Sequence, residues 1–373
     1  MRPLLTALDR PWSFFIAASV SMFSLFPFAR TLRASRGPTL FLGVCAVALF
    51  CCGSIFLVSA YLREGIVELI LCLALGLLAA AFSRSSECLF ALLILGMGQA
   101  VYCLYQTMTT SGGTISADLF RSGGTFGNTI VAGTMFGCVA PAAALFGLVR
   151  GSAWLQACAA LIWLGLTMTW SRGPMAGAAL GVVGALWVSR STWSFDKTRS
   201  IAVFGIVVIT IASFAVRNLT PQRSLSTTRS DVGRIHQWEA AGNFFVSNPL
   251  GVGPGGVMFD LIAYVPGKGS RVIQSDDAKN ETLMMLDTFG VLGVVLEAAI
   301  IIGIWRVLSS SNSPTSVCLK GVFISLAIIS CFDSPFFVDG REVTLGWLGL
   351  FAGLVMKVDC EEKQNCLEKL AFA

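Results

Sequence analysis

Long apolar stretches constrain the fold of this chain more than any other feature of its sequence. Stretches of about 17–25 apolar residues, the length that crosses the hydrocarbon core of a bilayer, recur along almost the whole chain. The composition agrees, because 55% of the 373 residues are hydrophobic, 13% are charged and the mean hydropathy is +0.76. These values exclude an ordinary soluble globular protein. We expect an all-α fold, a polytopic transmembrane helix bundle of about 11–12 spans with one large loop.

The expected spans divide the chain into three parts. Residues 1–216 should hold transmembrane helices 1–8, residues 217–280 the large loop, and residues 281–373 helices 9–11 with a cytoplasmic tail. No charged segment with a short apolar core and a small-residue cleavage site opens the chain, so we expect the first span to be retained. The spans are expected near residues 12–29, 38–60, 65–82, 88–108, 128–149, 153–170, 174–190, 200–216, 281–305, 317–332 and 343–356.

The cysteines and the net charge narrow the classes of function. Twelve cysteines are scattered mostly inside the spans, without the spacing of metal ligands or of a disulfide framework. We therefore expect no metal and no cofactor. The net charge of +5 comes without a solvated basic domain, so nucleic acid is not expected as a partner.

Basic residues in short loops indicate which side of the membrane each loop faces. The loops predicted to be cytoplasmic carry Arg30, Arg33, Arg36, Arg84, Arg150, Arg190, Lys197, Arg199 and Arg306. The alternate loops, at residues 109–127, 171–173, 217–280 and 333–342, then face the other side. In a Gram-negative bacterium that side is the periplasm.

The loop at residues 217–280 is much longer than a helical hairpin needs, and long loops of this kind are usually functional. Its basic residues run against the topological trend, which suggests an anionic ligand, although a merely solvated loop would also be basic. These residues are Arg217, Arg223, Arg229, Arg234, Lys268 and Arg271.

A helix is predicted over residues 232–247 of this loop, with Asp231 as its N-cap and Asn248-Pro249 as its stop. Arg234, Trp238, Ala241 and Phe245 share one stripe of that helix. An arginine fork near a helix N-terminus matches phosphate oxygens, so Arg234 is a candidate for binding an anion.

The sequence NPLGVGPGG follows the predicted helix, at residues 248–256. Gly253 and Gly255 could let backbone amides approach a ligand closely, but the same spacing also makes ordinary turns. His236 is the only histidine of the chain. It falls on a different face of the helix from Arg234, which favours an exposed or capping role over a catalytic one.

Two further polar positions lie at the outer ends of predicted spans. Arg172 is expected in a tight hairpin between two spans, with Pro174 as the first helical residue; it either binds an anion or lies at the headgroups. Asn128 is expected at the outer mouth of another span, where a turn or a helix cap also suits it. The helix after the hairpin repeats glycine every fourth residue, a pattern typical of close helix packing in lipid, at Gly173, Gly177 and Gly181.

The stretch at residues 275–293 leads from the large loop into the next span. Asp276 or Asp277 is expected to cap that helix, which places Lys279 and Asn280 at its start. The macrodipole disfavours a lysine there, so Lys279 is a candidate for function. It is either a phosphate clamp or a neutral lysine that accepts a proton, unless it is simply interfacial. Deeper in the same span, two carboxylates are functional candidates by their position in the membrane, Asp287 and Glu297.

Four of these pieces, in this order, resemble the O-antigen ligase and polysaccharide polymerase family of bacterial inner-membrane proteins. The first is a G-T-F-G-N stretch at residues 124–128, and the second is an S-R-G hairpin at residues 171–173. The third is a G-R-x-x-x-W helix followed by N-P-L-G-x-G-P-G, at residues 233–255. The last corresponds to the family's H-N-x-x-L stretch before a G-x-x-G span, of which Asn280 and Leu283 match, and the set covers roughly residues 120–295.

The resemblance implies a GT-C-like, metal-independent glycosyltransferase in the bacterial inner membrane, with its active site facing the periplasm. It implies a glycan donor linked to undecaprenyl pyrophosphate, an acceptor glycan and membrane lipid as partners, and a chain-length regulator as a further candidate. The two motif arginines are thought to engage the pyrophosphate, and they match Arg172 and Arg234. The substrate-binding candidates are Asn128, Trp238, Gly253, Gly255, Arg271, Asn280 and Glu281.

One position departs from the family pattern. The family histidine, thought to help activate the acceptor hydroxyl, is Lys279 here, followed by the expected Asn280 and Leu283. Only a neutral Lys279, or a carboxylate such as Asp277 or Glu281, could accept the hydroxyl proton. The departure suits a polymerase, or a family member with altered or lost activity, better than a ligase.

Three functions are therefore compared. The main hypothesis is polymerisation of the repeat units of a surface polysaccharide, whether exopolysaccharide, capsule or O-antigen. The second is an O-antigen ligase that transfers a lipid-linked glycan to lipid A core, as in lipopolysaccharide. The third is a non-enzymatic flippase of lipid-linked glycans, against which the special residues cluster on one side of the membrane rather than at its midplane.

Overall fold

A computed structural model of the chain describes twelve helices and strands between residues 85 and 333, together with scattered residues of a C-terminal helix. The described residues are 85–111, 113–116, 119–190, 221–252, 257–265, 269–275, 277–311 and 313–333, with isolated positions at 205, 208 and 212 and several between 351 and 364. The spans expected near residues 12–29, 38–60 and 65–82, and most of those near 200–216 and 343–356, lie outside the described residues.

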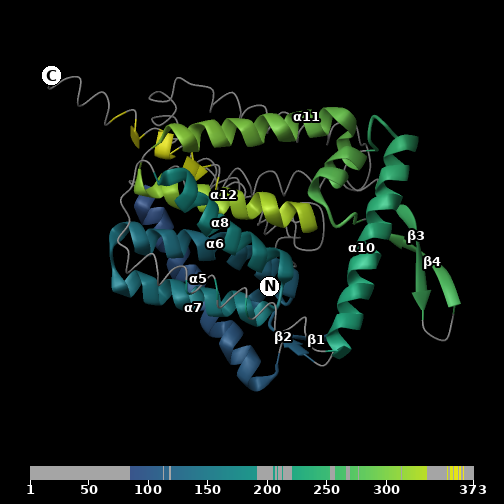
Figure 1. The fold of residues 1–373 in the computed structure, drawn as a ribbon, viewed down its shortest axis with the longest axis horizontal. Helices are drawn as coiled ribbons and strands as arrows, with labels where there is room; N and C mark the ends of the chain where they lie inside the picture. The colour runs from purple at the N-terminus through teal and green to yellow at the C-terminus, as the bar shows by residue number, and fades with distance from the viewer. Residues whose placement is uncertain are drawn as a thin grey trace, which may run out of the picture.

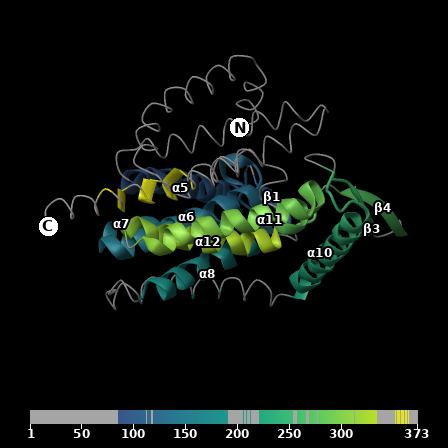
Figure 2. The same cartoon turned by 90° about the horizontal axis from the view of Figure 1, so that it is seen from above.

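A bundle of six helices makes up most of the described structure (Figures 1 and 2). Three of them are long and apolar enough to cross a membrane: α5 (Ser85–Thr109), α6 (Thr129–Arg150) and α12 (Pro314–Phe332). The others are α7 (Ala153–Thr169), α8 (Arg172–Ser189) and α11 (Glu281–Ser310). All six lie where apolar spans were predicted, within a few residues.

Helix α11 is broken rather than straight, as Figure 1 shows. Its backbone leaves the helical region at Gly290 (φ 66°, ψ −160°). The pieces Glu281–Val295 and Glu297–Ser310 meet at an angle of 56°. Counted together, the two pieces give a fourth candidate span among the residues that the structure describes.

Small residues allow the bundle helices to approach each other closely. The predicted glycine face of α8 packs against α12: a Cβ at Gly177 would lie 2.8 Å from the carbonyl oxygen of Ser325, and one at Gly181 would lie 2.5 Å from that of Gly321. The sequence prediction of a close-packed glycine face is therefore confirmed. Helix α6, rich in alanine and glycine, is buried along almost its whole length at the centre of the bundle.

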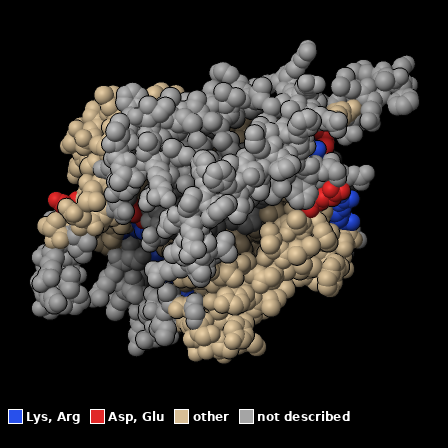
Figure 3. Space-filling model, turned by 180° about the vertical axis from the view of Figure 1, so that it is seen from behind, with Lys and Arg blue, Asp and Glu red and all other residues tan. Residues whose placement is uncertain are grey.

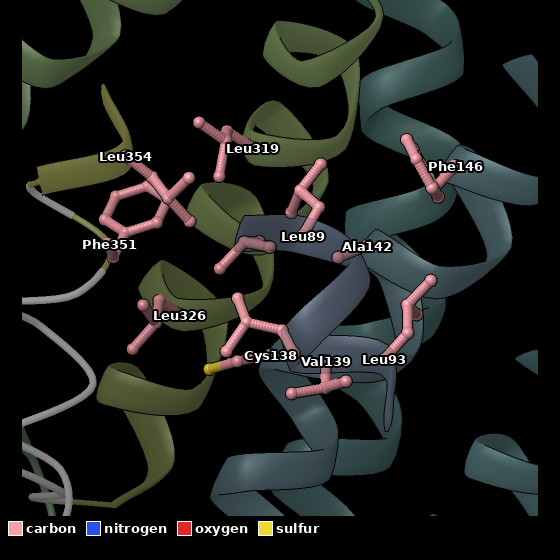
Figure 4. Close-up of a pocket in the computed structure, with 12 residues that line it drawn as sticks. Leu89, Leu93, Cys138, Val139, Ala142, Phe146, Leu319, Leu326, Phe351 and Leu354 are labelled. Carbon is pink, nitrogen blue, oxygen red and sulfur yellow. The ribbon is translucent and has the colours of Figure 1, made fainter. Parts of the chain in front are cut away.

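The core of the bundle consists mainly of apolar side chains from α5, α6, α7, α8 and α12. It includes a cavity between α5, α6, α12 and the C-terminal residues, which Figure 4 shows. The side chains around this cavity offer no charged group, and they include Leu89, Cys138, Val139, Leu319, Phe351 and Leu354. In Figure 3, the visible Lys, Arg, Asp and Glu residues lie mainly toward the two ends of the molecule.

Helix α10 (Pro221–Ser247) runs across one end of the bundle in both views (Figures 1 and 2). It ends where predicted, but it begins well before residue 232, so Asp231 lies inside the helix and is not its N-cap. Pro221 is compatible with a helix start because its fixed φ and missing N–H suit the first turn.

A β-hairpin that the sequence did not predict packs outside α10. Strands β3 (Phe259–Val265) and β4 (Gly269–Ser275) are antiparallel, with Phe259 opposite Ser275 and Val265 opposite Gly269. The expectation of an all-α fold is therefore correct for the bundle and wrong for this part of the large loop. A second, shorter hairpin pairs β1 (Thr114–Ser116) with β2 (Leu119–Arg121).

The loop has a small hydrophobic core of its own. Ala241 of α10, Val257, Phe259 of β3, Ala278 and Met284 of α11 are buried together, apart from the core of the bundle. The outer piece of α11 thus packs with α10 and the hairpin. Its inner piece contributes Val307 and Leu308 to the core of the bundle.

Candidate functional site

The candidate site lies where the bundle meets α10, and four segments bring cations to it. Arg121 ends β2, Arg172 begins α8, Arg234 lies on α10, and Lys279 precedes α11. Two buried aspartates stand among these cations, Asp277 and Asp333.

Lys279 is held from several directions. Its ammonium forms an ion pair with Asp277, and its Nζ lies 3.7 Å from Oδ1 of Asp333. Its backbone N–H donates to Oδ1 of Asp277 at 2.8 Å, and its carbonyl accepts from the indole N–H of Trp238 at 3.4 Å. Its φ of 52° is in the left-handed region, which a lysine rarely adopts. A strained backbone conformation persists only where the surrounding contacts hold it in place, and such conformations cluster at functional sites.

The environment keeps Lys279 charged. Burial by itself would lower the pKa of Lys279, and nearby Arg234 acts in the same direction. The carboxylates of Asp277 and Asp333 outweigh both, so the pKa of this lysine is raised above its ordinary value. A raised pKa suits a charge clamp better than a proton acceptor, and both roles of Lys279 stay predictions.

Asn280 is the N-cap of α11, where an aspartate was predicted. Its side-chain oxygen accepts from the N–H of Leu283 at 3.0 Å, and its Nδ2 donates to the carbonyl of Cys331 at 3.1 Å. The helix therefore begins at Glu281, and Lys279 lies outside it. Because the cap also bonds to the end of α12, it fixes Lys279 relative to the bundle. The predictions that Asn280 and the buried Glu281 bind substrate stay predictions.

Arg172 is the first residue of α8, so the predicted first helical residue, Pro174, is in fact the third. The hairpin before it is tied to the neighbouring helix, because the hydroxyl of Ser171 donates to the carbonyl of Thr129 at 2.9 Å. Asn128 caps α6 as predicted, its side chain accepting from the N–H groups of residues 130 and 131. The starts of α6 and α8 are thus held side by side.

Sequence reasoning missed two residues of this site. Arg121 lies in the predicted outer loop 109–127, where the sequence indicates no role for it, yet its Nε donates to the carbonyl of Thr169 at 3.0 Å and its Nη2 to the hydroxyl of Ser171 at 3.2 Å. Asp333 ends α12, and its carboxylate faces Lys279. Both partnerships join residues about 50 positions apart, and no local pattern reveals them.

The structure describes some of the remaining predicted site residues and not others. The indole of Trp238 reaches the site through the carbonyl of Lys279. His236 is exposed and pairs with Glu239 one turn along α10, at 3.3 Å, in line with the expected minor role. Arg271 lies in β4, but its side chain, like Gly253 and Gly255, falls outside the described residues.

Within the part of the chain that the structure describes, no group of three or more histidines, cysteines, aspartates or glutamates is placed to hold a metal ion. The site is therefore built from guanidinium, ammonium and carboxylate groups. Cations that converge from separate segments are suited to binding an anion with several oxygens.

The comparison with protein families finds a match for the region that contains most of this site. Residues 136–298 match the family model described as O-antigen ligase. The match covers less than half of the 373-residue chain, and it shows that this region is similar to the O-antigen ligase family. No curated protein matches the chain. Members of that family act on lipid-linked glycans as ligases and polymerases, and residues 136–298 of this chain are similar to them.

The O-antigen ligase match covers part of the site only. Arg172, Arg234 and Lys279 lie within the matched residues, whereas Arg121 precedes them and Asp333 follows them. The structure thus adds two flanking residues to the cations that the family motifs indicate.

Proposed function

We propose that this protein polymerises the repeat units of a surface polysaccharide, using a glycan linked to undecaprenyl pyrophosphate as donor, at a site facing the periplasm. The observation that carries the proposal is the convergence of Arg121, Arg172, Arg234 and Lys279 at one end of the bundle. Glycosyl transfer breaks the bond between the sugar and the pyrophosphate, and the negative charge that develops there needs cations close by.

The proposed roles follow from the geometry. Arg172 and Arg234 bind the pyrophosphate, and Lys279, fixed by Asp277 and Asp333, supplies a permanent positive charge beside it. The acceptor hydroxyl forms the new bond to the sugar, and its proton passes to a carboxylate such as Asp277 or Glu281. Asn280 and Trp238 hold Lys279 in place, and Asn128 holds the start of α6.

A ligase that transfers the glycan to lipid A core is the second candidate, because the matched family includes this activity. Lys279 in place of the family histidine favours the polymerase. The described site lies at one end of the bundle, and this position weighs against a flippase, whose substrate site is expected near the midplane.

A deletion strain separates the three functions. A polymerase mutant should carry single repeat units on its surface lipid, and a ligase mutant should retain full-length polymer on the lipid carrier. Repeat units that accumulate on the cytoplasmic leaflet would instead identify a flippase.

Two variants test the anion site directly. Arg172→Ala and Arg234→Ala should each abolish polymer while the protein is still made and inserted. Arg190→Ala is the matched control, since Arg190 stacks 4.0 Å from the ring centroid of Trp187 at the opposite end of α8. Wild-type polymer from both site variants would refute pyrophosphate binding by these arginines.

A further inference from the structure

Arg121 has the attributes of a ligand-binding residue rather than of a surface arginine. Its guanidinium is half-buried, and two of its N–H groups are used by the carbonyl of Thr169 and the hydroxyl of Ser171. A guanidinium has five N–H groups. The others have no acceptor among the residues that the structure describes, so the group is oriented by the protein and only partly satisfied by it.

The charges around Arg121 are also unbalanced. Burial lowers the pKa of Arg121, and the nearby positive charge of Arg172 lowers it further. Asp333 opposes both effects, but the same carboxylate also stands 3.7 Å from Lys279. The single carboxylate of Asp333 thus lies near two cations, Arg121 and Lys279, which belong to different segments. A bound anion would relieve the repulsion between the two arginines.

Ser171 couples Arg121 to Arg172. The hydroxyl of Ser171 accepts from Arg121 and donates to the carbonyl of Thr129, at the start of α6. Arg172 follows directly in the chain, so the two arginines are held as a pair. Two guanidinium groups close enough for their charges to repel each other match the several oxygens of a diphosphate better than those of a single carboxylate.

We propose that Arg121 is a further substrate-binding residue, whose guanidinium binds the diphosphate of the lipid-linked donor together with Arg172. This inference rests on the proposed function and adds to it a residue that lies outside the matched family region. The competing explanation is that Arg121 only ties β2 to the hairpin before α8.

The test measures binding of inorganic pyrophosphate, and the KM for a pyrophosphate-linked donor, with the full-length protein in lipid nanodiscs. Arg121→Gln should weaken pyrophosphate binding at least about tenfold, because hydrogen bonds to charged groups contribute more than neutral ones. The KM should rise with it. Methylguanidinium added to Arg121→Ala should restore part of the binding, which a purely structural role would not allow.

Ser171→Ala is the matched control, since it removes the tie to Arg121 and leaves the guanidinium in place. It should lower pyrophosphate affinity much less than Arg121→Gln does. Equal losses in the two variants, or wild-type affinity in Arg121→Gln, would overturn the inference. If Arg121→Gln does not fold, Arg121→Lys decides: it keeps the charge without the fork and should bind several-fold more weakly, whereas unchanged affinity refutes the proposal.

The outcomes also separate this inference from the proposed function. Loss of binding in Arg172→Ala and Arg234→Ala, with Arg121→Gln unaffected, would refute only the role of Arg121. Wild-type pyrophosphate binding in all three variants would refute the anion site as a whole.

Discussion

Replacing Gly251 by alanine should destabilise the contact between the large loop and α11. Gly251 has a φ of +76°, and its backbone packs directly against α11. An added Cβ would collide with the carbonyl oxygen of Thr288 and would lie 2.5 Å from the nitrogen of Gly290. These are backbone atoms, which cannot rotate away as a flexible side chain could.

The expected cost has two parts. The left-handed conformation costs an alanine about 1–2 kcal/mol, and forcing extra volume into a packed contact costs about 1–3 kcal/mol. We therefore expect Gly251→Ala to lower the free energy of unfolding by about 2–5 kcal/mol. The turn also carries the hydrogen bond from the N–H of Val252 to the carbonyl of Asp287, at 3.1 Å. Displacing the turn should therefore disturb the start of α11 and reduce glycan transfer.

Gly242→Ala provides the control for this prediction. Gly242 lies within α10, and a Cβ there would meet nothing within 4 Å. Alanine should stabilise this helix by about 0.5–1 kcal/mol. The assay is denaturant unfolding of both purified variants in the same detergent. If Gly251→Ala proves as stable as Gly242→Ala, the close packing of the loop on α11 is wrong.

Three further predictions concern the start of α11. The pKa of Lys279 is raised in the folded protein. Its positive charge is therefore fully present below the ordinary lysine pKa and is lost only as the pH rises through the higher folded value. The charge should thus stay constant from pH 6 to 9. The rate of glycan transfer by Lys279→His should fall as the pH rises from 6 to 8, because histidine loses its charge in this range. A rate that rises instead would indicate that residue 279 acts as a base. The rate of the control variant Lys279→Arg should not change over this range. Asp287 is 0% exposed, and neither of its carboxylate oxygens has a hydrogen-bond partner among the residues that the structure describes. Asp287→Asn should therefore raise the free energy of unfolding at pH 8 by about 1 kcal/mol, and a loss would contradict this reasoning. Asn280→Ala should lower the free energy of unfolding by about 1 kcal/mol through loss of the helix cap, and by a further amount through loss of the bond to Cys331. Asn280→Asp keeps the cap acceptor and loses only the bond to Cys331. Equal melting temperatures of the two variants would show that the cap does not contribute separately.

The positions of the apolar helices, and the candidate cations in the family motifs, could be predicted from the sequence. Long apolar stretches placed α5, α6 and α12 because length and hydropathy are local properties. Arg172, Arg234 and Lys279 could be identified because each stands in its own short motif.

The rest of the site depends on contacts between distant segments. Arg121 and Asp333 join it only because β2 and the end of α12 reach the same place in the folded chain. The β3–β4 hairpin was missed because β4 is largely polar. The early start of α10 was missed because residues 221–231 show little apolar periodicity. The division into parts at residues 216 and 280 stays a prediction.

The broken helix α11 has a mechanical consequence. A continuous helix resists bending through its ladder of hydrogen bonds, and the interruption at Gly290 removes that resistance. The outer piece of α11 packs with α10 and the small core of the loop, whereas the inner piece belongs to the bundle. Arg234 and Lys279 therefore lie with the outer piece, and Arg121, Arg172 and Asp333 lie with the bundle. The contacts of Lys279 with Asp333 and of Asn280 with Cys331 join the two parts, so bending at the break would have to separate both contacts.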